Sequence, residues 1–237
     1  MLGVVIALPS EAVCLLGRDT PVGGPRQYRD ILVSISGMGP ERASQAAENL
    51  VRSGARALLS WGTAAALDPA LRSGQLLLPE HILQVDGSRL SVDPRWRKAL
   101  LERLGSMLRP RGGTLISSNR AITTPSAKQT LFQSSGAVAV DMESAAVASI
   151  ANTAGLPFAC IRAIVDEAGM SIPELALTTV DAYGRPRLPL LLQGLLHRPA
   201  TLPALIRLGR SFSRARTSLR TVSRCCGYNL ALPAAPH

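Results

Sequence analysis

Two kinds of segment alternate along the chain. Short runs of apolar residues predict β-strands at 2–8, 31–35, 57–60, 75–78, 82–85, 114–117, 138–140 and 158–165. Apolar residues that recur every three or four positions predict helices at 40–53, 94–104, 124–133 and 145–154, with a further helix starting near residue 11. Turns are predicted at 9–11 and 62–66. The alternation predicts an α/β fold of three layers, in which helices cover a mixed, mostly parallel central sheet.

The segment 141–169 is the centre of this pattern. Residues 158–165 are almost continuously apolar, as in a strand that is buried on both faces of a sheet, and the run ends on Asp166. Ligands of such sheets bind beyond the carboxyl ends of the strands, which makes Asp166 a candidate site residue. Arg162 precedes Asp166 by four residues, so we expect both on the same side of this strand.

Three acidic residues lie at strand ends or helix starts of the predicted sheet: Glu11, Glu143 and Asp166. Each has an ordinary structural explanation. Asp166 can cap a helix, and Glu11 and Glu143 can lie solvated in the first turn of a helix, where a negative charge is favourable. Their common placement on one parallel sheet favours a shared site.

The net charge of +10 on the 237 residues is unevenly distributed. No acidic residue follows Asp181, whereas the same segment holds nine arginines: Arg185, Arg187, Arg198, Arg207, Arg210, Arg214, Arg216, Arg220 and Arg224. We therefore separate residues 1–182, an α/β domain that carries the chemistry, from residues 183–237, a basic C-terminal segment. Such asymmetry indicates an anionic partner, either nucleic acid or lipid headgroups. Scarce aromatic residues, 3% of the chain, argue against nucleic acid.

The C-terminal segment has two apolar features. Residues 188–196, LPLLLQGLL, are flanked by arginines and are too short to span a bilayer. A helix predicted from Pro203 has arginines on one face and an apolar stripe on the other, formed by Leu205, Leu208, Phe212, Ala215, Leu219 and Val222. Two interpretations stand together: a helix that closes the fold, and an amphipathic segment that lies on an anionic membrane.

The cysteines show neither metal-binding nor disulfide spacing. Cys14 and Cys160 lie on apolar segments and are expected in the core, while the adjacent Cys225 and Cys226 cannot easily bridge each other. No apolar run reaches the ~18 residues of a transmembrane helix, and the first strand lacks the basic start of a signal peptide. We expect a cytoplasmic protein, peripheral to the inner membrane if the C-terminal segment docks there, that uses no metal or other cofactor.

Four motifs in order give the sequence a family resemblance. They are IALPSEAV, SISGMGPERASQAAENL, ALLSWGTAAALDPALRSGQLLLPE and VDMESAAVASIANTAGLPFACIRAIVDEAG. Over about residues 1–170 they resemble the purine nucleoside phosphorylase and methylthioadenosine/S-adenosylhomocysteine nucleosidase superfamily. Within it, the arginine-rich ending looks most like the phosphorylase-like proteins of bacterial hopanoid lipid synthesis.

The resemblance implies an enzyme that cleaves the N-glycosidic bond of a nucleoside. That reaction needs an acid that protonates the leaving base and a carboxylate near the sugar, where positive charge develops. By resemblance, Asp166 protonates the adenine, Glu143 binds the ribose 2′- and 3′-hydroxyls, and Glu11 orients or deprotonates the attacking water. The remaining substrate-binding residues that it implies are Met142 at the sugar, Thr63, Ile122 and Met38.

The sequence departs from the family at several points. Ala65-Ala66 replaces a Gly-Gly pair, which predicts a reshaped purine pocket or a strained turn, since alanine resists positive φ. Ile122 stands where the family often stacks a phenylalanine on the base. The Gly-Asp-Pro-x-x-Arg phosphate-binding turn of many phosphorylases is absent. Its absence favours water as the nucleophile, with Glu11 beside it, but inorganic phosphate held by the turn and an arginine such as Arg42 stays open as a co-substrate.

These observations favour one hypothesis for the function: release of adenine from a lipid nucleoside, adenosylhopane, to give ribosyl hopane. The apolar segment 188–196 near a nucleoside site suits a large lipid on the 5′ carbon. A methylthioadenosine/S-adenosylhomocysteine nucleosidase is one alternative, and a non-catalytic nucleoside- or lipid-binding protein is another. The resemblance also implies a homo-oligomer, since the family is commonly dimeric or hexameric.

Overall fold

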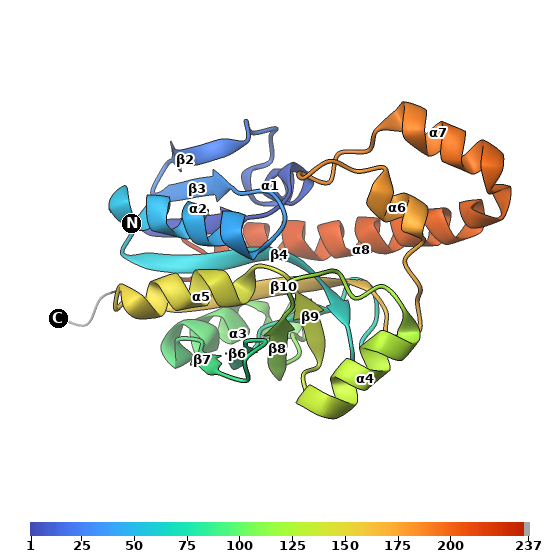
Figure 1. Ribbon diagram of the computed structural model, residues 1–237. Helices are drawn as coiled ribbons and strands as arrows, with labels where there is room; N and C mark the ends of the chain where they lie inside the picture. Colours follow the sequence, from blue (N-terminus) through green and yellow to red (C-terminus); the bar gives the residue numbers. More distant parts are fainter. Residues whose placement is uncertain (235–237) are drawn as a thin grey trace.

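The computed structural model describes residues 1–234, which form a ten-stranded mixed sheet with helices on both faces (Figure 1). The strands are β1 (Leu2–Ile6), β2 (Gly23–Tyr28), β3 (Ile31–Ile35), β4 (Ala57–Ala66), β5 (Leu76–Leu77), β6 (His81–Leu83), β7 (Arg89–Ser91), β8 (Thr114–Ser117), β9 (Ala139–Asp141) and β10 (Phe158–Asp166). Their order is β2-β3-β1-β4-β9-β8-β6-β7, and β10 pairs with β4 and β5. The predicted α/β class is confirmed.

The helices form the two outer layers. They are α1 (Pro9–Leu16), α2 (Pro40–Arg52), α3 (Pro94–Leu108), α4 (Pro125–Ser135), α5 (Ser144–Thr153), α6 (Glu174–Thr178), α7 (Leu188–His197) and α8 (Leu202–Cys226), with a 3-10 turn at Pro199–Thr201. Helices α2 and α5 pack side by side on one face, over β1, β3, β4 and β10 (Figure 1). Helix α8 packs on the other face against β10, α1 and α3. The apolar core fills the space between these layers and the sheet.

Strands β4 and β10 are the buried centre of the sheet. They run parallel, with Phe158 opposite Leu58 and Cys160 opposite Ser60, and nearly all of their residues are buried. Helices therefore cover both faces of this pair, as the continuous apolar run predicted. Strand β1 is also parallel to β4, so the carboxyl ends of β1, β4 and β10 meet at one edge of the sheet.

The turn predicted at residues 62–66 is wrong. This segment continues β4, and Ala65 and Ala66 pair with β9. The non-glycine residues with positive φ in the described chain lie elsewhere, at Arg29, Arg109, Leu230 and Ala231. The alanine pair is not strained, because an extended strand needs no left-handed backbone.

Three further differences lie at the ends and edges of elements. Residues 9–11 form the first turn of α1 rather than a turn before it, with Pro9 at the first helical position, where proline is favoured. Strand β2, GGPRQY, escaped prediction because its residues are exposed or half-buried and carry no apolar pattern. It pairs antiparallel with β3 at the edge of the sheet, where a proline is tolerated. Strand β7 and helix α6 are too short to produce a periodic signal.

Helices α7 and α8 differ in their contacts with the core. The stripe on α8 is buried in its C-terminal half, at Ala215, Leu219 and Val222, and only partly buried at Leu205, Leu208 and Phe212. Half of α8 therefore closes the fold. Helix α7 stands off to the right in Figure 1, and none of its residues is buried. Within residues 1–234, no helix is long and apolar enough to cross a bilayer.

The Leu219→Ala variant tests how far α8 belongs to the core. The Leu219 side chain is fully buried, so we expect its truncation to lower the free energy of unfolding by about 2–5 kcal/mol. Leu196→Ala, on the 83% exposed Leu196 of α7, should change it by less than about 0.5 kcal/mol. Urea unfolding measures both variants. Equal, small effects would contradict the packing of α8 described above.

Candidate active site

The candidate residues gather around one cavity at the carboxyl ends of β1, β4 and β10. Six of the seven predicted site residues line it: Glu11, Met38, Thr63, Ile122, Met142 and Glu143. The seventh, Asp166, is 1% exposed and does not line the cavity, although its neighbour Val165 does. The structure brings two of the three acids together around the cavity and places the third, the expected proton donor, behind the cavity wall.

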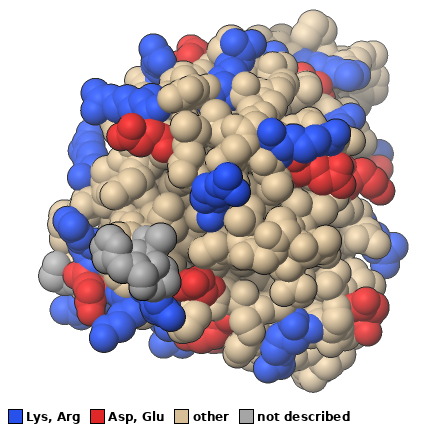
Figure 2. Space-filling model, turned by 90° about the vertical axis from the view of Figure 1, so that its left-hand side faces the viewer, with Lys and Arg blue, Asp and Glu red and all other residues tan. Residues whose placement is uncertain are grey.

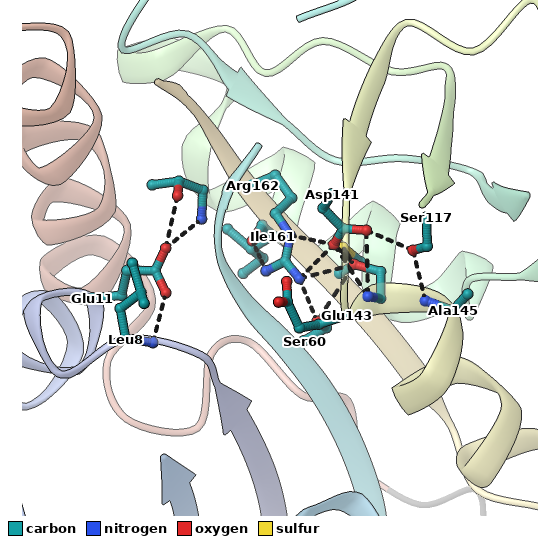
Figure 3. A network of polar contacts seen from close by, with 12 residues as sticks. Leu8, Glu11, Ser60, Ser117, Asp141, Glu143, Ala145, Ile161 and Arg162 are labelled. Carbon is teal, nitrogen blue, oxygen red and sulfur yellow. Dashed lines mark hydrogen bonds and ion pairs between the residues drawn. The ribbon is translucent and has the colours of Figure 1, made fainter. Parts of the chain in front are cut away.

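Glu11 connects helix α1 with strand β4. Its Oε2 accepts a hydrogen bond from the Leu8 amide at 3.2 Å, which caps the first turn of α1 (Figure 3). Its Oε1 accepts hydrogen bonds from the Thr63 amide and the Thr63 hydroxyl, both at 2.8 Å. Burial raises the pKa of Glu11, and the charge of Arg162 and the bonds from Thr63 act against this rise. Glu11 therefore caps a helix and also lines the cavity.

Gly62 leaves the room that the Glu11 carboxylate occupies. A Cβ atom at position 62 would lie 2.9 Å from both carboxylate oxygens of Glu11. Such an approach is closer than packed atoms tolerate, so a larger residue would displace the carboxylate. The sequence analysis did not single out Gly62, since its neighbour Glu11 is 51 positions away.

Glu143 connects the start of α5 with the start of α2. Its Oε1 accepts a hydrogen bond from the Gly39 amide at 2.9 Å. Gly39 has a φ of 105°, a conformation that favours glycine. Burial, and then the negative charge of Asp141, raise the pKa of Glu143 to about 7, while Arg162 and the Gly39 amide act against the rise. This carboxyl group therefore changes its charge near neutral pH.

A buried arginine, Arg162, lies beside these acids. Its Nε donates to Asp141 Oδ2 at 2.9 Å, and its Nη2 lies 2.7 Å from the same oxygen (Figure 3). Nη2 also donates to the hydroxyls of Ser60 at 2.6 Å and Ser144 at 2.9 Å, and the Ser117 hydroxyl donates to Asp141 Oδ1 at 2.5 Å. Several partners thus satisfy both charges, as a buried ion pair requires.

The sequence analysis assigned no role to Arg162 or Asp141, yet both line the cavity. The sequence did contain a signal for this pair: Arg162 is a charged residue inside an apolar strand, and a buried charge needs a partner of opposite charge. The expectation that Arg162 and Asp166 share one side of β10 is wrong. A bulge shifts the pairing of β10 with β4 between Ile164 and Asp166, and a bulge of this kind reverses the alternation of side chains.

Asp166 faces Lys128 of α4 instead of the cavity. Its Oδ2 lies 2.6 Å from Lys128 Nζ, and the two side chains are 1% and 0% exposed. The contact is an ion pair by distance, although its angles are not those of a hydrogen bond. Burial raises the pKa of Asp166 to about 6, and Lys128 acts against this rise. The residue pattern carried no signal for Lys128, because a lysine in a predicted helix is normally solvated.

The site therefore offers acid–base groups with distinct surroundings. Glu143, with a pKa of about 7, and Asp166, with a pKa of about 6, both exchange protons in the range where general acids and bases work best. Within residues 1–234, no group of three His, Cys, Asp or Glu side chains could hold a metal ion.

Comparison with known proteins agrees with this geometry. A model of the phosphorylase superfamily matches residues 26–181, and the chain therefore belongs to this superfamily. The match covers three of the four motifs quoted above and leaves out the N-terminal one, which contains Glu11. The superfamily predicted from the sequence is confirmed by this match. A search of curated proteins finds no match.

Solved structures with the same fold include three bacterial proteins. The 5′-methylthioadenosine/S-adenosylhomocysteine nucleosidase of Helicobacter pylori has a TM-score of 0.69 and 18% identity, covering 93% of this chain and 96% of that one. Futalosine hydrolase of the same organism has a TM-score of 0.69 and 19% identity, covering 93% and 95%. The nucleosidase of Campylobacter jejuni has a TM-score of 0.68 and 20% identity, covering 95% and 97%. At these identities the likeness establishes the fold.

The Glu143→Gln variant tests the electrostatics of the cavity. In the unfolded chain Glu143 loses its proton near its ordinary pKa of 4.5, and in the folded protein only at about 7. Stability from this group is therefore present below about pH 4.5 and declines as pH rises towards 7. Glutamine stays neutral and can still accept the Gly39 hydrogen bond, so at pH 8 we expect it to raise the free energy of unfolding by about 1–3 kcal/mol.

Urea unfolding at pH 5 and pH 8 measures this effect. The gain should be large at pH 8 and small at pH 5, and Glu102→Gln on the exposed face of α3 should change neither value. A loss of stability at pH 8 would show that the ionised Glu143 is held favourably by Arg162 and would contradict the raised pKa.

Proposed function

We propose that this protein hydrolyses the N-glycosidic bond of an adenine nucleoside. The observation that carries the proposal is the convergence of Glu11 and Glu143 on one cavity whose wall, at Val165, continues directly into Asp166. Glu11 takes a proton from water while the water oxygen bonds to C1′ of the ribose. The bond from C1′ to the base breaks, and Asp166, once its side chain turns from Lys128 into the cavity, gives its proton to the leaving adenine.

The other residues of the cavity hold the nucleoside. Glu143 binds the 2′- and 3′-hydroxyls and stabilises the positive charge that develops on the ribose. Met142 packs against the sugar, and Met38 lies next to Gly39, whose amide fixes Glu143. Ile122 provides an aliphatic contact with the base. Thr63 orients Glu11 through its amide and hydroxyl and also faces the substrate.

Water is the nucleophile in this proposal because Glu11 occupies the donors that an anion would need. The Thr63 amide and hydroxyl, which the sequence analysis left open as phosphate donors, already bind the Glu11 carboxylate at 2.8 Å. A phosphate at this place would meet a second negative charge, which opposes its binding. Arg42, the arginine that the sequence analysis left open for a phosphate contact, lies near Gly37 at the start of α2 and does not line the cavity.

The assay for this reaction is adenine release in water enriched in oxygen-18, with and without inorganic phosphate. We expect the ribose product to carry the label, at a rate that phosphate does not change. Glu11→Gln should lower kcat by about 10²–10⁴-fold, since it removes the base. Asp166→Asn should lower it comparably and keep the fold, measured by circular dichroism.

The control for these variants is Glu102→Gln on exposed α3, which should keep full activity. A phosphorylated sugar product that forms only with phosphate present would replace hydrolysis by phosphorolysis. Binding of nucleoside without any release of adenine would favour the non-catalytic binding protein instead.

The substrate that we propose is a lipid nucleoside, adenosylhopane, which would yield ribosyl hopane and adenine. Ile172 lines the cavity, and the chain then leads straight into α6. A second pocket lies between α6 and α7, and Leu175 and Leu190 contribute apolar side chains to it. We propose that an apolar 5′ substituent leaves the cavity along this segment. Faster release from methylthioadenosine than from adenosylhopane would favour the small-substrate nucleosidase.

We further propose that residues 183–237 place the enzyme on an anionic membrane. Large apolar residues that are exposed cluster on α6, α7 and the start of α8: Leu177, Leu188, Leu190, Leu192, Leu196, Leu202 and Ile206. Exposed arginines accompany them, at Arg185, Arg187, Arg198, Arg207 and Arg210. The opposite end of the molecule has acidic and basic groups interspersed (Figure 2). An apolar surface with basic neighbours suits anionic headgroups on the inner face of a cytoplasmic membrane.

Vesicle binding tests this contact. We expect the protein to sediment with vesicles that contain phosphatidylglycerol and to bind neutral vesicles much more weakly. Leu196→Ser should weaken binding about tenfold, because it removes most of the burial of one leucine. Val85→Ser, at an exposed apolar residue of another surface, is the matched control and should have no effect. Equal losses in both variants would contradict the assignment.

We also propose that the protein is a homo-oligomer, as the family resemblance implies. Light scattering tests this by comparing the mass in solution with the chain mass of 25.0 kDa.

A further inference from the structure

Lys128 is an unusual residue for its position. It is one of only two lysines in a chain with 26 basic residues, and its side chain is completely buried. It lies in the first turns of α4, which begins at Pro125, where a positive charge is unfavourable to the helix dipole. Burial of a charged ammonium group is also unfavourable unless partners surround it. Both effects oppose folding, which indicates that the buried ammonium group of Lys128 has a role other than stabilising helix α4.

The ammonium group of Lys128 has three partners in the segment that ends β10. Its Nζ donates to the carbonyl oxygens of Glu167 at 2.8 Å and Met170 at 2.7 Å, and it lies 2.6 Å from Asp166 Oδ2. Two of the three N–H donors of the ammonium group are thus used by backbone carbonyls, and its charge is paired with the Asp166 carboxylate. A single side chain of α4 thereby fixes both the expected proton donor and the loop that follows it.

The same loop forms part of the cavity. The Ile172 amide donates to the Thr123 carbonyl oxygen at 2.9 Å, which ties the loop after β10 to the loop before α4 a second time. Ile172 and Ile122, on the two tied loops, both line the cavity. A shift of Lys128 would therefore move Asp166. It would also move the part of the cavity wall that Ile122 and Ile172 form.

The charged groups around Asp166 come from two places. Lys128 approaches from α4, and Glu167 follows directly in the chain. The Glu167 carboxylate turns away, because its Oε1 accepts hydrogen bonds from the amide and hydroxyl of Ser73, both at 3.0 Å, and Arg72 and Arg214 lie near it. Lys128 is thus the cation in direct contact with Asp166 within residues 1–234.

We propose that Lys128 is a positioning residue that anchors Asp166 and the loop after β10, and whose charge controls the protonation of this acid. The part that concerns the reaction rests on the function proposed above, in which Asp166 protonates the leaving adenine. Lys128 stabilises the ionised form of Asp166 and so limits the pH range in which the acid carries a proton. Removing the charge should extend that range upwards while loosening the placement of the acid.

The pH dependence of kcat/KM tests the effect of the charge. A general acid works while protonated, so activity should fall as pH rises through the pKa of Asp166, which is about 6. In Lys128→Met this fall should move up by about one pH unit, because the opposing cation is lost. We also expect kcat to drop about tenfold or more with a smaller change in KM, because the loop that follows the acid loses its two carbonyl contacts with Lys128 while the substrate-binding residues stay in place. Lys98→Met, on exposed α3, is the control and should leave the profile unchanged.

A second measurement is independent of turnover. Protein with lysine labelled by carbon-13 at Cε has only two such signals, and Lys98→Arg assigns them. The Lys128 signal should titrate near pH 6 as Asp166 gains its proton, and Asp166→Asn should abolish that step while the Lys98 signal stays constant. These signals test the contact between Lys128 and Asp166 even if the protein releases no adenine. In that case the proposed function is wrong, while the ion pair between the two residues is still established by the titration.

Two results would overturn the inference. One is a Lys128 signal that Asp166→Asn leaves unchanged, which would show that the two groups do not interact in solution. The other is a folded Lys128→Met variant whose pH profile and kcat match those of the parent protein. Loss of stability in Lys128→Met with an unchanged pH profile would also reject the proposal, because it would show a purely structural lysine.

Discussion

Burial of charge at one end of the sheet is the constraint on which the rest of the structure depends. Four carboxyl groups, those of Glu11, Asp141, Glu143 and Asp166, lie at most 9% exposed near the carboxyl ends of β4 and β10. Isolated buried charges are strongly unfavourable, so each needs a partner. Two buried cations, Arg162 and Lys128, provide partners from different layers of the fold, and backbone amides provide the others.

This arrangement gives chemically identical groups different behaviour. Asp141 is paired with Arg162 and held by serine hydroxyls, whereas burial, and then the like charge of Asp141, raise the pKa of Glu143 to about 7. Glu11 receives three hydrogen bonds, two of them from Thr63. Asp166 lies against one lysine on the far side of the cavity wall. Differences in protonation among neighbouring acids are what acid–base cleavage of a glycosidic bond requires.

The C-terminal segment joins this chemical core to a different kind of surface. The second half of α8 is packed into the fold, and helix α7 remains without any buried residue. One helix therefore belongs to the core at one end and to an exposed apolar surface at the other. The route proposed above, from the cavity through Ile172 and α6 to that surface, would allow one enzyme to bind a nucleoside whose substituent stays in a membrane.

Periodicity and composition determined the local structure. The apolar run 158–165 predicted a doubly covered strand, and the spacing of apolar residues predicted most helices, because burial against one neighbour leaves a regular pattern. The motifs also indicated Glu11, Glu143 and Met142, which line the cavity. Strand β2 and the end of β4 were not predictable, since edge pairing and small residues such as Ala65 and Ala66 leave no such pattern.

Only the tertiary structure decided which groups meet. Arg162 and Asp141 are 21 positions apart, and Lys128 and Asp166 are 38 apart, and no periodicity links them. The bulge at the end of β10 reverses the side on which Asp166 lies, a change that an even spacing cannot reveal. Sequence pattern records whether a residue is buried, whereas partners across layers depend on how the layers pack, and that is a property of the whole chain.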